Sequence, residues 1–441
     1  MSDNNDNKMH PSAQGKHTKP DVKNQPNRPP HPAYDQHDDD DFDDLEKRFS
    51  THGKNRYYAK VSTGYRAVKL ILVILLTAVI AFALVLGSDN FTYANLRYLL
   101  RNLGEANSAE TERAAAIEFH GADGTDLAIF SGKLAVAGTD NVSLYRLSGK
   151  KLYELATDVS EPVITEGGKY FFVWKCGEPE ISVYNNVSRV GTITADGPVY
   201  ALSADNSGSF AVLYKDRVYS SAVAVYDSDL DKRATKNMPS ENAVDIALSG
   251  DGRMLYTLSF SVGEGDYVAK LDFSDINGAA VTHTYTYSGE FPLKCGAFSD
   301  GGCYAVTDKS LCVYSSEGTL LYSEKTDDTP YRIIANDAYA CIVTGGKGSG
   351  ERFTVVSQSG AVAVSATVDG AVLDGCLTED ALFLLSSSIV SISLEDGNRQ
   401  LIARSPNALS LLTDGAAVYC VYTGRAELVY ADGKPFDAPN D

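Results

Sequence analysis

The sequence predicts an all-β ectodomain built as an eight-bladed β-propeller, preceded by one transmembrane helix and a disordered tail. Three observations carry this prediction. An uncharged apolar run of 18 residues, Leu70 to Gly87, follows a polar N-terminal stretch. A unit of two apolar strands joined by a small polar turn then recurs eight times. These units follow one another at intervals close to the propeller period of about 40 residues.

Residues 1–66 form the first predicted segment, a disordered cytoplasmic tail. The first 50 residues contain six prolines and few large apolar groups, so they bury too little surface to offset chain entropy. An acidic run from Asp38 to Asp44, interrupted only by Phe42, ends this stretch. We interpret the run as a solvated, self-repelling block. The alternative is a docking tail for a basic cytoplasmic partner.

Residues 67–87 are predicted to form the transmembrane helix. The 18 uncharged residues would extend about 27 Å as a helix, close to the thickness of the hydrocarbon core. Seven basic residues precede the span within about 25 residues, whereas only Arg97 and Arg101 follow it closely. The positive-inside rule therefore places the N-terminus in the cytoplasm and the C-terminal domain outside the cell membrane.

Residues 88–112 are predicted to form a juxtamembrane helix and a linker. Leu96, Leu99, Leu100 and Leu103 recur at helical spacing, and Gly104 follows them. We expect this amphipathic helix to lie on the outer membrane face or under the propeller.

Residues 113–434 contain the repeat that predicts the propeller. In the second strand of each unit, the residues that point to either face of the sheet are apolar, so both faces are expected to be buried. Marker positions in the third strands are separated by 39, 42, 45, 43, 42, 37 and 37 residues: Tyr145, Tyr184, Tyr226, Leu271, Tyr314, Val356, Ser393 and Tyr430. A four-stranded unit of this length favours eight blades, with seven as the alternative.

The two ends of the repeat predict how the ring is closed. The last unit has little sequence left for an outer strand, and residues 435–441 form a C-terminal tail. An additional strand, Ala114 to His120, precedes the first complete unit. We expect this N-terminal strand to complete the last blade and to remove an exposed edge.

The hairpin from Ser249 to Gly252 and the Leu-Tyr-Thr-Leu strand that follows resemble those of YVTN and WD-repeat-like propellers. The order of tail, span, Asn95–Leu100 helix and propeller resembles an uncharacterised family of membrane-anchored propeller proteins from Gram-positive anaerobes. The resemblance covers roughly residues 66–431. It implies the fold and supplies no functional residues.

Charge restricts the class of partner. Residues 88–441 hold 27 basic and 47 acidic residues, a net charge of −20, whereas residues 1–87 hold 12 and 11. An acidic domain repels nucleic acid and anionic lipid, so neither is an expected ligand of the propeller. All seven cysteines lie beyond residue 170, mostly in apolar contexts, and we interpret them as unpaired core thiols.

No convincing catalytic or metal site follows from the sequence. His120 and His283 are the only histidines of the ectodomain, and neither stands beside a nucleophile in the sequence pattern. Asp227, Asp229 and Asp231 alternate as in a calcium loop, but Lys232 and Met238 occupy the positions that need Gly and Glu. We therefore expect no cofactor, no metal and no enzymatic activity.

Three long loops between second and third strands form the candidate binding surface, at Lys215–Ser221, Ser261–Tyr267 and Gly345–Phe353. The candidate binding residues in them are Arg217, Tyr219, Glu264, Asp266, Tyr267, Lys347 and Arg352. The favoured function is a binding or scaffolding module for a protein or a cell-envelope polymer. One alternative is a receptor-like sensor coupled to the tail, and the least favoured is a carboxylate-dependent hydrolase.

Overall fold

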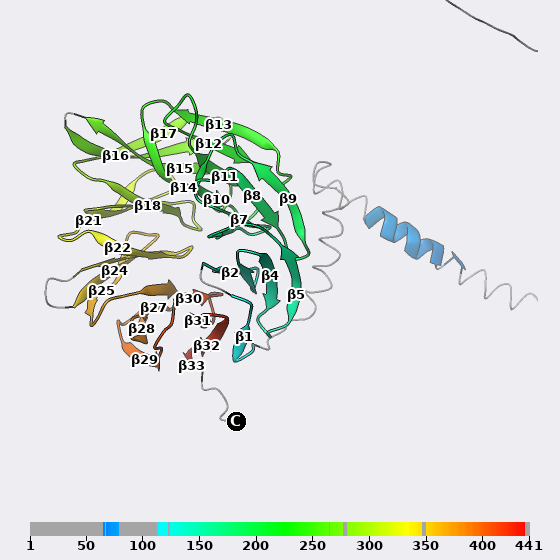
Figure 1. Ribbon diagram of the computed structural model, residues 1–441. Coiled ribbons are helices and arrows are strands. Elements are labelled where there is room, and N and C mark those ends of the chain that lie inside the picture. The colour runs from blue at the N-terminus through cyan, green and yellow to red at the C-terminus, as the bar shows by residue number, and fades with distance from the viewer. Residues whose placement is uncertain are drawn as a thin grey trace, which may run out of the picture. The chain divides into compact units, whose positions relative to one another are not determined.

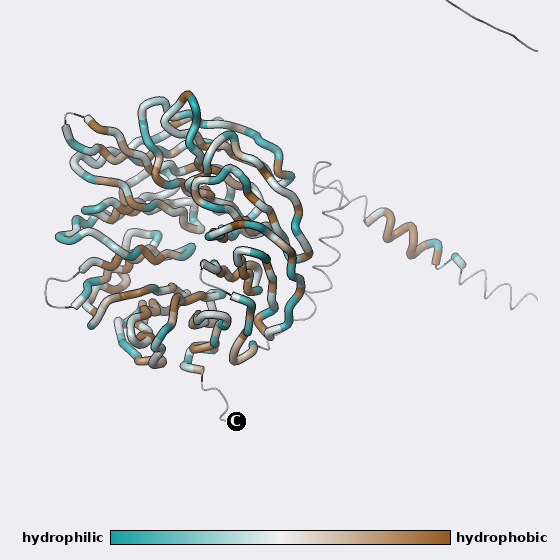
Figure 2. The backbone as a smooth tube through the Cα atoms, viewed as in Figure 1, coloured by the Kyte–Doolittle hydropathy of each residue, from teal (hydrophilic) through white to brown (hydrophobic). Residues whose placement is uncertain are grey.

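The structure is a computed structural model and describes residues 65–66, 68–78, 113–121, 124–263, 265–276, 280–345 and 350–436. The chain divides into two compact units, Met1–Ser88 and Asp89–Asp441. Residues 68–78 of the first unit are helical, and Figure 2 shows that most of this helix is hydrophobic. Its large apolar side chains are exposed. Among the described residues, no helix combines the length and the hydropathy that a membrane span requires. Residues 79–87 of the predicted span, nearly all of the predicted tail and the juxtamembrane segment lie outside the described residues.

The second unit is an eight-bladed β-propeller, which confirms the predicted architecture of this part of the chain and excludes the seven-bladed alternative. Eight antiparallel sheets are arranged in a ring (Figure 1). Each sheet is a meander in which consecutive strands pair, because short polar turns join them. The first strand of each sheet lies at the centre, where it meets first strands of neighbouring sheets, as β10 meets β14.

The strands of blades one to four, innermost first, are β2 Asp126–Phe130, β3 Lys133–Ala137, β4 Asn141–Arg146 and β5 Lys151–Ala156; β6 Val163–Glu166, β7 Phe171–Trp174, β8 Glu180–Tyr184 and β9 Arg189–Thr194; β10 Val199–Ala204, β11 Phe210–Tyr214, β12 Ser221–Tyr226 and β13 Lys232–Met238; β14 Asn242–Leu248, β15 Met254–Gly263, β16 Asp266–Asp275 and β17 Val281–Ser288.

Those of blades five to eight are β18 Pro292–Ala297, β19 Cys303–Thr307, β20 Ser310–Tyr314 and β21 Leu320–Lys325; β22 Pro330–Ala335, β23 Tyr339–Thr344, β24 Glu351–Ser357 and β25 Val362–Val368; β26 Asp374–Leu377, β27 Ala381–Leu385, β28 Ser388–Ser393 and β29 Arg399–Arg404; and β30 Ser410–Thr413, β31 Val418–Tyr422, β32 Arg425–Ala431 and β33 Lys434–Pro435.

The second and third strands form the core of each blade. In blade three, every residue of β11 and β12 is buried, whereas exposed and buried residues mix along the outer strand β13. This confirms that the continuously apolar second strands are covered on both faces, because each blade packs between two others. All eight marker residues lie in third strands, as predicted.

Eight apolar clusters hold the ring together, one at each contact between consecutive blades. Aromatic pairs fill several of these contacts. The ring centroids of Phe172 and Phe210 are 4.6 Å apart between blades two and three, and those of Phe383 and Tyr430 are 4.8 Å apart between blades seven and eight. Such pairs add about 0.5–1.5 kcal/mol to the burial of their area.

The outer edge of blade eight is made of two chain segments. The N-terminal strand β1, Ala116–Glu118, pairs antiparallel with β32, with Ile117 opposite Ala426. Strand β33 pairs with the other end of β32, at Tyr430 and Ala431. Ile117 is buried in the cluster that joins the last blade to the first, together with Tyr145 of blade one.

Two predictions differ from the structure. The segment Ser261–Tyr267 is not a loop, because β15 and β16 continue through it and only residues 264–265 connect them. All seven cysteines are free, and six are buried as predicted, but Cys176 is exposed. It lies in the connection between β7 and β8, where it faces solvent instead of the core.

Candidate functional site

The loop face of the propeller carries the candidate site. We define it as the face formed by the connections between second and third strands and by the links between blades. The opposite face, the turn face, carries the tight turns between first and second strands and between third and fourth strands. Antiparallel order places these two sets of connections at opposite ends of every sheet.

The connection between β11 and β12 presents Arg217 and Tyr219 to solvent. One carboxylate oxygen of Asp216 accepts the backbone N–H groups of Val218 and Tyr219, at 2.7 and 2.9 Å. These two hydrogen bonds lower the pKa of Asp216 and fix the shape of the loop. Val218 is 82% exposed and Tyr219 is 36% exposed, so the loop offers apolar and aromatic surface beside an exposed guanidinium.

The hairpin of β15 and β16 projects further than any other described hairpin. Each of its strands has ten residues, and no other described strand exceeds eight. Val262 pairs with Tyr267 near the tip, and both side chains are exposed. The ring of Tyr267 lies 5.5 Å from that of Phe291 in the next link, which braces it. Asp266 is also exposed at this tip, whereas Glu264 lies outside the described residues.

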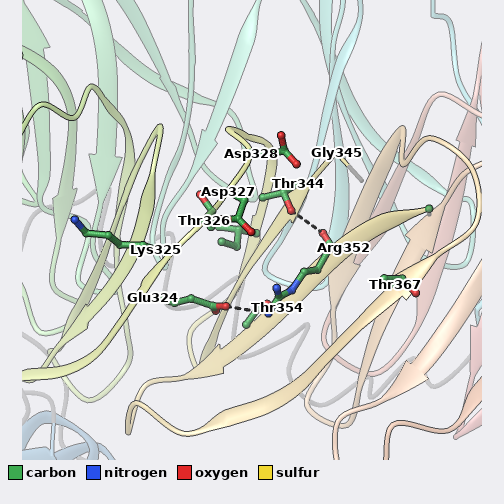
Figure 3. A pocket seen from close by; sticks show the side chains of 12 residues that line it. Glu324, Lys325, Thr326, Asp327, Asp328, Thr344, Gly345, Arg352, Thr354 and Thr367 are labelled. Atoms are coloured by element: carbon green, nitrogen blue, oxygen red, sulfur yellow. Dashed lines mark hydrogen bonds and ion pairs between the residues drawn. The ribbon is translucent and has the colours of Figure 1, made fainter. Parts of the chain in front are cut away.

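A polar pocket of about 220 Å³ lies between blades five and six (Figure 3). Its base is an ion pair between Arg352 of β24 and Glu324 of β21, with 3.0 Å between the guanidinium nitrogen and the carboxylate oxygen. The hydroxyl of Tyr322 donates to the other oxygen of Glu324, at 2.5 Å. The carboxylate of Glu324 therefore positions Arg352, and the hydroxyl of Tyr322 positions this carboxylate in turn.

Hydroxyl groups line the rest of this pocket, from Thr326, Thr344, Thr354 and Thr367. The hydroxyl oxygen of Thr326 is buried and has no hydrogen-bond partner among the described residues. Asp327 and Asp328 also line the pocket, and Figure 3 shows Asp328 above Arg352 and Asp327 beside Thr326. Such a lining suits a small polar group that both donates and accepts hydrogen bonds. Lys347, predicted for this site, lies outside the described residues.

The candidate binding residues that the structure describes lie on one face but not in one pocket. Arg217 and Tyr219 belong to blade three, Asp266 and Tyr267 to blade four, and Arg352 to blade six. They thus outline an extended surface and not a single cleft. Glu324 and Thr326 complete the pocket around Arg352. The sequence pattern does not mark either residue, because they occupy ordinary outer-strand and link positions.

A second cavity, of about 270 Å³, lies among the inner strands of blades two to five, and Asp337 of blade six also lines it. Asp245 of β14 lines it, and its carboxylate accepts the backbone N–H of Cys295 in the next blade, at 3.0 Å. Asp126 and Asp374 accept backbone N–H groups of the following blades in the same way, from Ile164 and Leu411. These three aspartates occupy equivalent positions of the inner strands. Their recurrence in the sequence could therefore have indicated these hydrogen bonds between consecutive blades.

Burial raises the pKa of Asp245 to about 6, from an ordinary value of 3.8. The folded chain therefore binds this proton more tightly than the unfolded chain does. The resulting contribution to stability is full below pH 3.8 and is lost as the pH rises through about 6.

We expect the Asp245→Asn variant to gain stability relative to the parent as the pH rises. Between about pH 4 and about pH 7.5, the difference in unfolding free energy should shift by on the order of 2–3 kcal/mol in favour of the variant. Urea unfolding of both proteins at the two pH values measures this shift. An equal difference at both pH values would contradict the assignment of the raised pKa to this carboxyl group.

The other candidate groups occupy structural positions. His283 lies exposed on the outer strand β17, as predicted, and His120 follows β1. Asp227 accepts the backbone N–H groups of Asp229 and Asp231, both at 2.9 Å, which makes the segment a turn between β12 and β13. In the described part of the chain, no three His, Cys, Asp or Glu side chains are placed to hold a metal ion.

Comparison with known proteins identifies the family and the fold. A family of unknown function, designated DUF5711, matches residues 105–415. No curated protein matches the sequence. Among solved structures, Sqt1 of Saccharomyces cerevisiae is similar at a TM-score of 0.52 and 11% identity, over 75% of this chain and 99% of that chain. The C-terminal WD40 domain of Sif2 is similar at 0.51 and 11%, over 73% and 96%. At this identity the likeness shows the fold alone.

Proposed function

This chain belongs to the DUF5711 family, and we propose that it is a non-catalytic binding module, anchored in the cell membrane with its propeller outside the cytoplasm. The observation that carries the proposal is the loop face. A rigid ring presents there a projecting hairpin, an aromatic loop and a polar pocket, all with exposed side chains. Rigid scaffolds with variable surface loops favour recognition. The partner is a protein or a cell-envelope polymer.

The proposed anchor rests on the chain before the propeller. Residues 70–87 carry no charge and are mostly apolar, and the described part of this run, residues 70–78, exposes every large apolar side chain that it holds. Such a run is stable in lipid and unfavourable in water. The excess of basic residues before it supports a cytoplasmic N-terminus.

Protease added to intact, wall-stripped cells should degrade the chain after Gly87 and spare the tail. Only the extracytoplasmic side is accessible in intact cells, so the surviving fragment should react with an antibody against residues 1–60. Cells lysed before digestion serve as the control and should lose both parts. Protection of the propeller in intact cells would contradict the proposed orientation.

Photocrosslinking tests the binding function directly. A photoreactive phenylalanine analogue at Tyr219 or Tyr267, which are 36% and 49% exposed, should yield covalent adducts in intact cells. Matched controls are Leu321 and Leu320, which are 39% and 50% exposed but lie on the outer strand β21. We expect adducts from the loop face and few from the outer strand. Equal yields at all four positions would contradict a specific binding face.

A further inference from the structure

The polar pocket between blades five and six contains a buried hydroxyl group that has no hydrogen-bond partner. This hydroxyl belongs to Thr326, in the link between β21 and β22, and no described residue donates to it or accepts from it. A buried polar group in this state costs free energy, because it has lost its hydrogen bonds to water. The hydroxyl can both donate and accept, so a polar ligand in the pocket would remove this cost.

Two charged groups of the same pocket also retain free hydrogen-bonding capacity. The ion pair with Glu324 occupies one terminal nitrogen of Arg352, and the guanidinium has no second partner in the described part of the chain. The carboxylate of Asp327, which lies beside Thr326 in Figure 3, likewise accepts no hydrogen bond from a described residue. The pocket therefore offers unused donors from Arg352, unused acceptors from Asp327 and a hydroxyl that can act as either.

The lining of the pocket restricts the kind of ligand that fits. Ile342 is the single apolar side chain among the twelve lining residues, and none of the twelve is aromatic. Tryptophan and tyrosine side chains, which dominate many protein interfaces, would find no apolar wall there. The volume of about 220 Å³ is below the roughly 300–1,000 Å³ of pockets for drug-sized ligands. The matching ligand is therefore one small unit that is polar over its whole surface.

The charges of the pocket favour a neutral ligand. Three acidic and two basic residues line it, Glu324, Asp327, Asp328, Lys325 and Arg352, so their charges nearly cancel. An anion would have to compete with Glu324 for Arg352. A cation would leave the remaining guanidinium N–H groups of Arg352 without acceptors. Neutral hydroxyl groups can bond to both kinds of side chain, because each of them donates and accepts.

We propose that this pocket binds one neutral sugar unit of a cell-envelope polymer, whose hydroxyl groups bond to Thr326, Asp327 and Arg352. This inference rests on the proposed binding function and specifies its ligand. A sugar ring carries hydroxyl groups on most of its carbons, so neighbouring hydroxyls can donate to a carboxylate and accept from a guanidinium. These directional hydrogen bonds orient the bound unit and leave the rest of the polymer to extend across the loop face.

An oligosaccharide array probed with the full-length chain tests this ligand class. The chain is kept in octaethylene glycol monododecyl ether, because the head groups of alkyl glycoside detergents are themselves neutral sugars. The neutral probes are immobilised chitotriose, cellotriose and maltotriose. Fully deacetylated chitotriose is the cationic probe, and trigalacturonate is the anionic probe.

We expect the chain to bind at least one neutral probe more tightly than it binds either charged probe. The dissociation constant of that probe should change by less than roughly twofold between about 50 and about 300 mM salt, because the ligand carries no charge that salt could screen. A cationic or anionic ligand would instead lose affinity as the salt concentration rises.

The Thr326→Val variant distinguishes a binding role from a structural one. Valine lacks the hydroxyl, so the neutral probe should bind roughly threefold to tenfold more weakly, the loss of about one hydrogen bond. The melting temperature should not fall, because the free protein loses only an unpaired buried hydroxyl. The matched control is Thr257→Val in β15, whose hydroxyl is also buried without a described partner but lies outside the pocket. The control should keep the parental affinity.

The Asp327→Asn variant tests the charged acceptor. Hydrogen bonds to a carboxylate are about twice as strong as those between neutral groups, so we expect the neutral probe to lose at least tenfold, roughly, in affinity. Asp327 is exposed, so its substitution should leave the melting temperature unchanged.

Three results would overturn the proposal. They are the absence of binding to every neutral probe, tighter binding of a charged probe, and parental affinity in either pocket variant. The photocrosslinks from Tyr219 and Tyr267 separate this failure from that of the binding function. Adducts there, together with an array that binds no neutral probe, would leave a binding module with a different ligand. Absence of both would reject the two proposals together.

Discussion

Replacing Ile117 by aspartate is expected to destabilise the whole propeller. Ile117 is 1% exposed and lies in the cluster that joins blade eight to blade one. The substitution removes apolar contacts and buries an unpaired carboxylate, a combined cost on the order of 4–5 kcal/mol. Thermal unfolding of the purified protein should show a large drop in melting temperature, because the strand holds two ends of the ring.

The same strand supplies its own control. Ala116 precedes Ile117 but its side chain is exposed, so Ala116→Asp adds the same charge without burying it. Its effect should stay within about 0.5 kcal/mol. Deletion of Ala114–His120 should match or exceed the effect of Ile117→Asp, since the last blade then loses the pairing of β1 with β32. A deletion that unfolds at the parental temperature would show that this strand does not fasten the ring.

Combined replacement of Arg217, Tyr267 and Arg352 by alanine is expected to abolish capture of the partner. Exposed arginine and tyrosine supply directional hydrogen bonds and contact area, so we expect at least a tenfold loss of the product crosslinked from position 219. Stability should change by only about 1 kcal/mol, because all three side chains are exposed. Removal of the Arg352 side chain breaks its ion pair with Glu324, but Glu324 still accepts the hydrogen bond from the hydroxyl of Tyr322.

Substitution on the turn face should separate stability from binding. Asp300 accepts the backbone N–H of Gly302 at 2.8 Å and sets the turn between β18 and β19. Asp300→Ala should therefore lower the melting temperature and leave capture by the folded fraction unchanged. If the loop-face triple variant captures its partner normally while folded, the binding site lies elsewhere on the molecule.

The fold could be predicted because it repeats. Each blade contributes the same sequence pattern, an apolar inner strand, a small polar turn and a continuously apolar second strand, so an error in one unit is corrected by the others. The position of the N-terminal strand followed from the shortness of the last unit. Tyr145 and the other markers fell in third strands because blade length sets their spacing.

The candidate site on the loop face could be predicted only in part, because its residues lie where the individual blades differ from the repeated pattern. Ser261–Tyr267 contains glycine and charged residues and indicated a loop, but cross-strand pairs such as Val262 with Tyr267 extend the hairpin through it. The pocket at Arg352 combines residues of two blades, and only the packing of the blades brings Glu324 to it.

The divided outer strand of blade eight also determines where mechanical load enters the domain. Strand β33 occupies one end of the edge of β32 and β1 the other, so the preceding chain reaches the propeller through Arg113 and β1. Arg113 forms an ion pair with Asp414 at this entry, with 2.9 Å between nitrogen and oxygen. A pull on the linker therefore acts first on this ion pair and on the short ladder from Ala116 to Glu118. Tension that peels β1 away would expose the edge of the last blade before any other blade is disturbed.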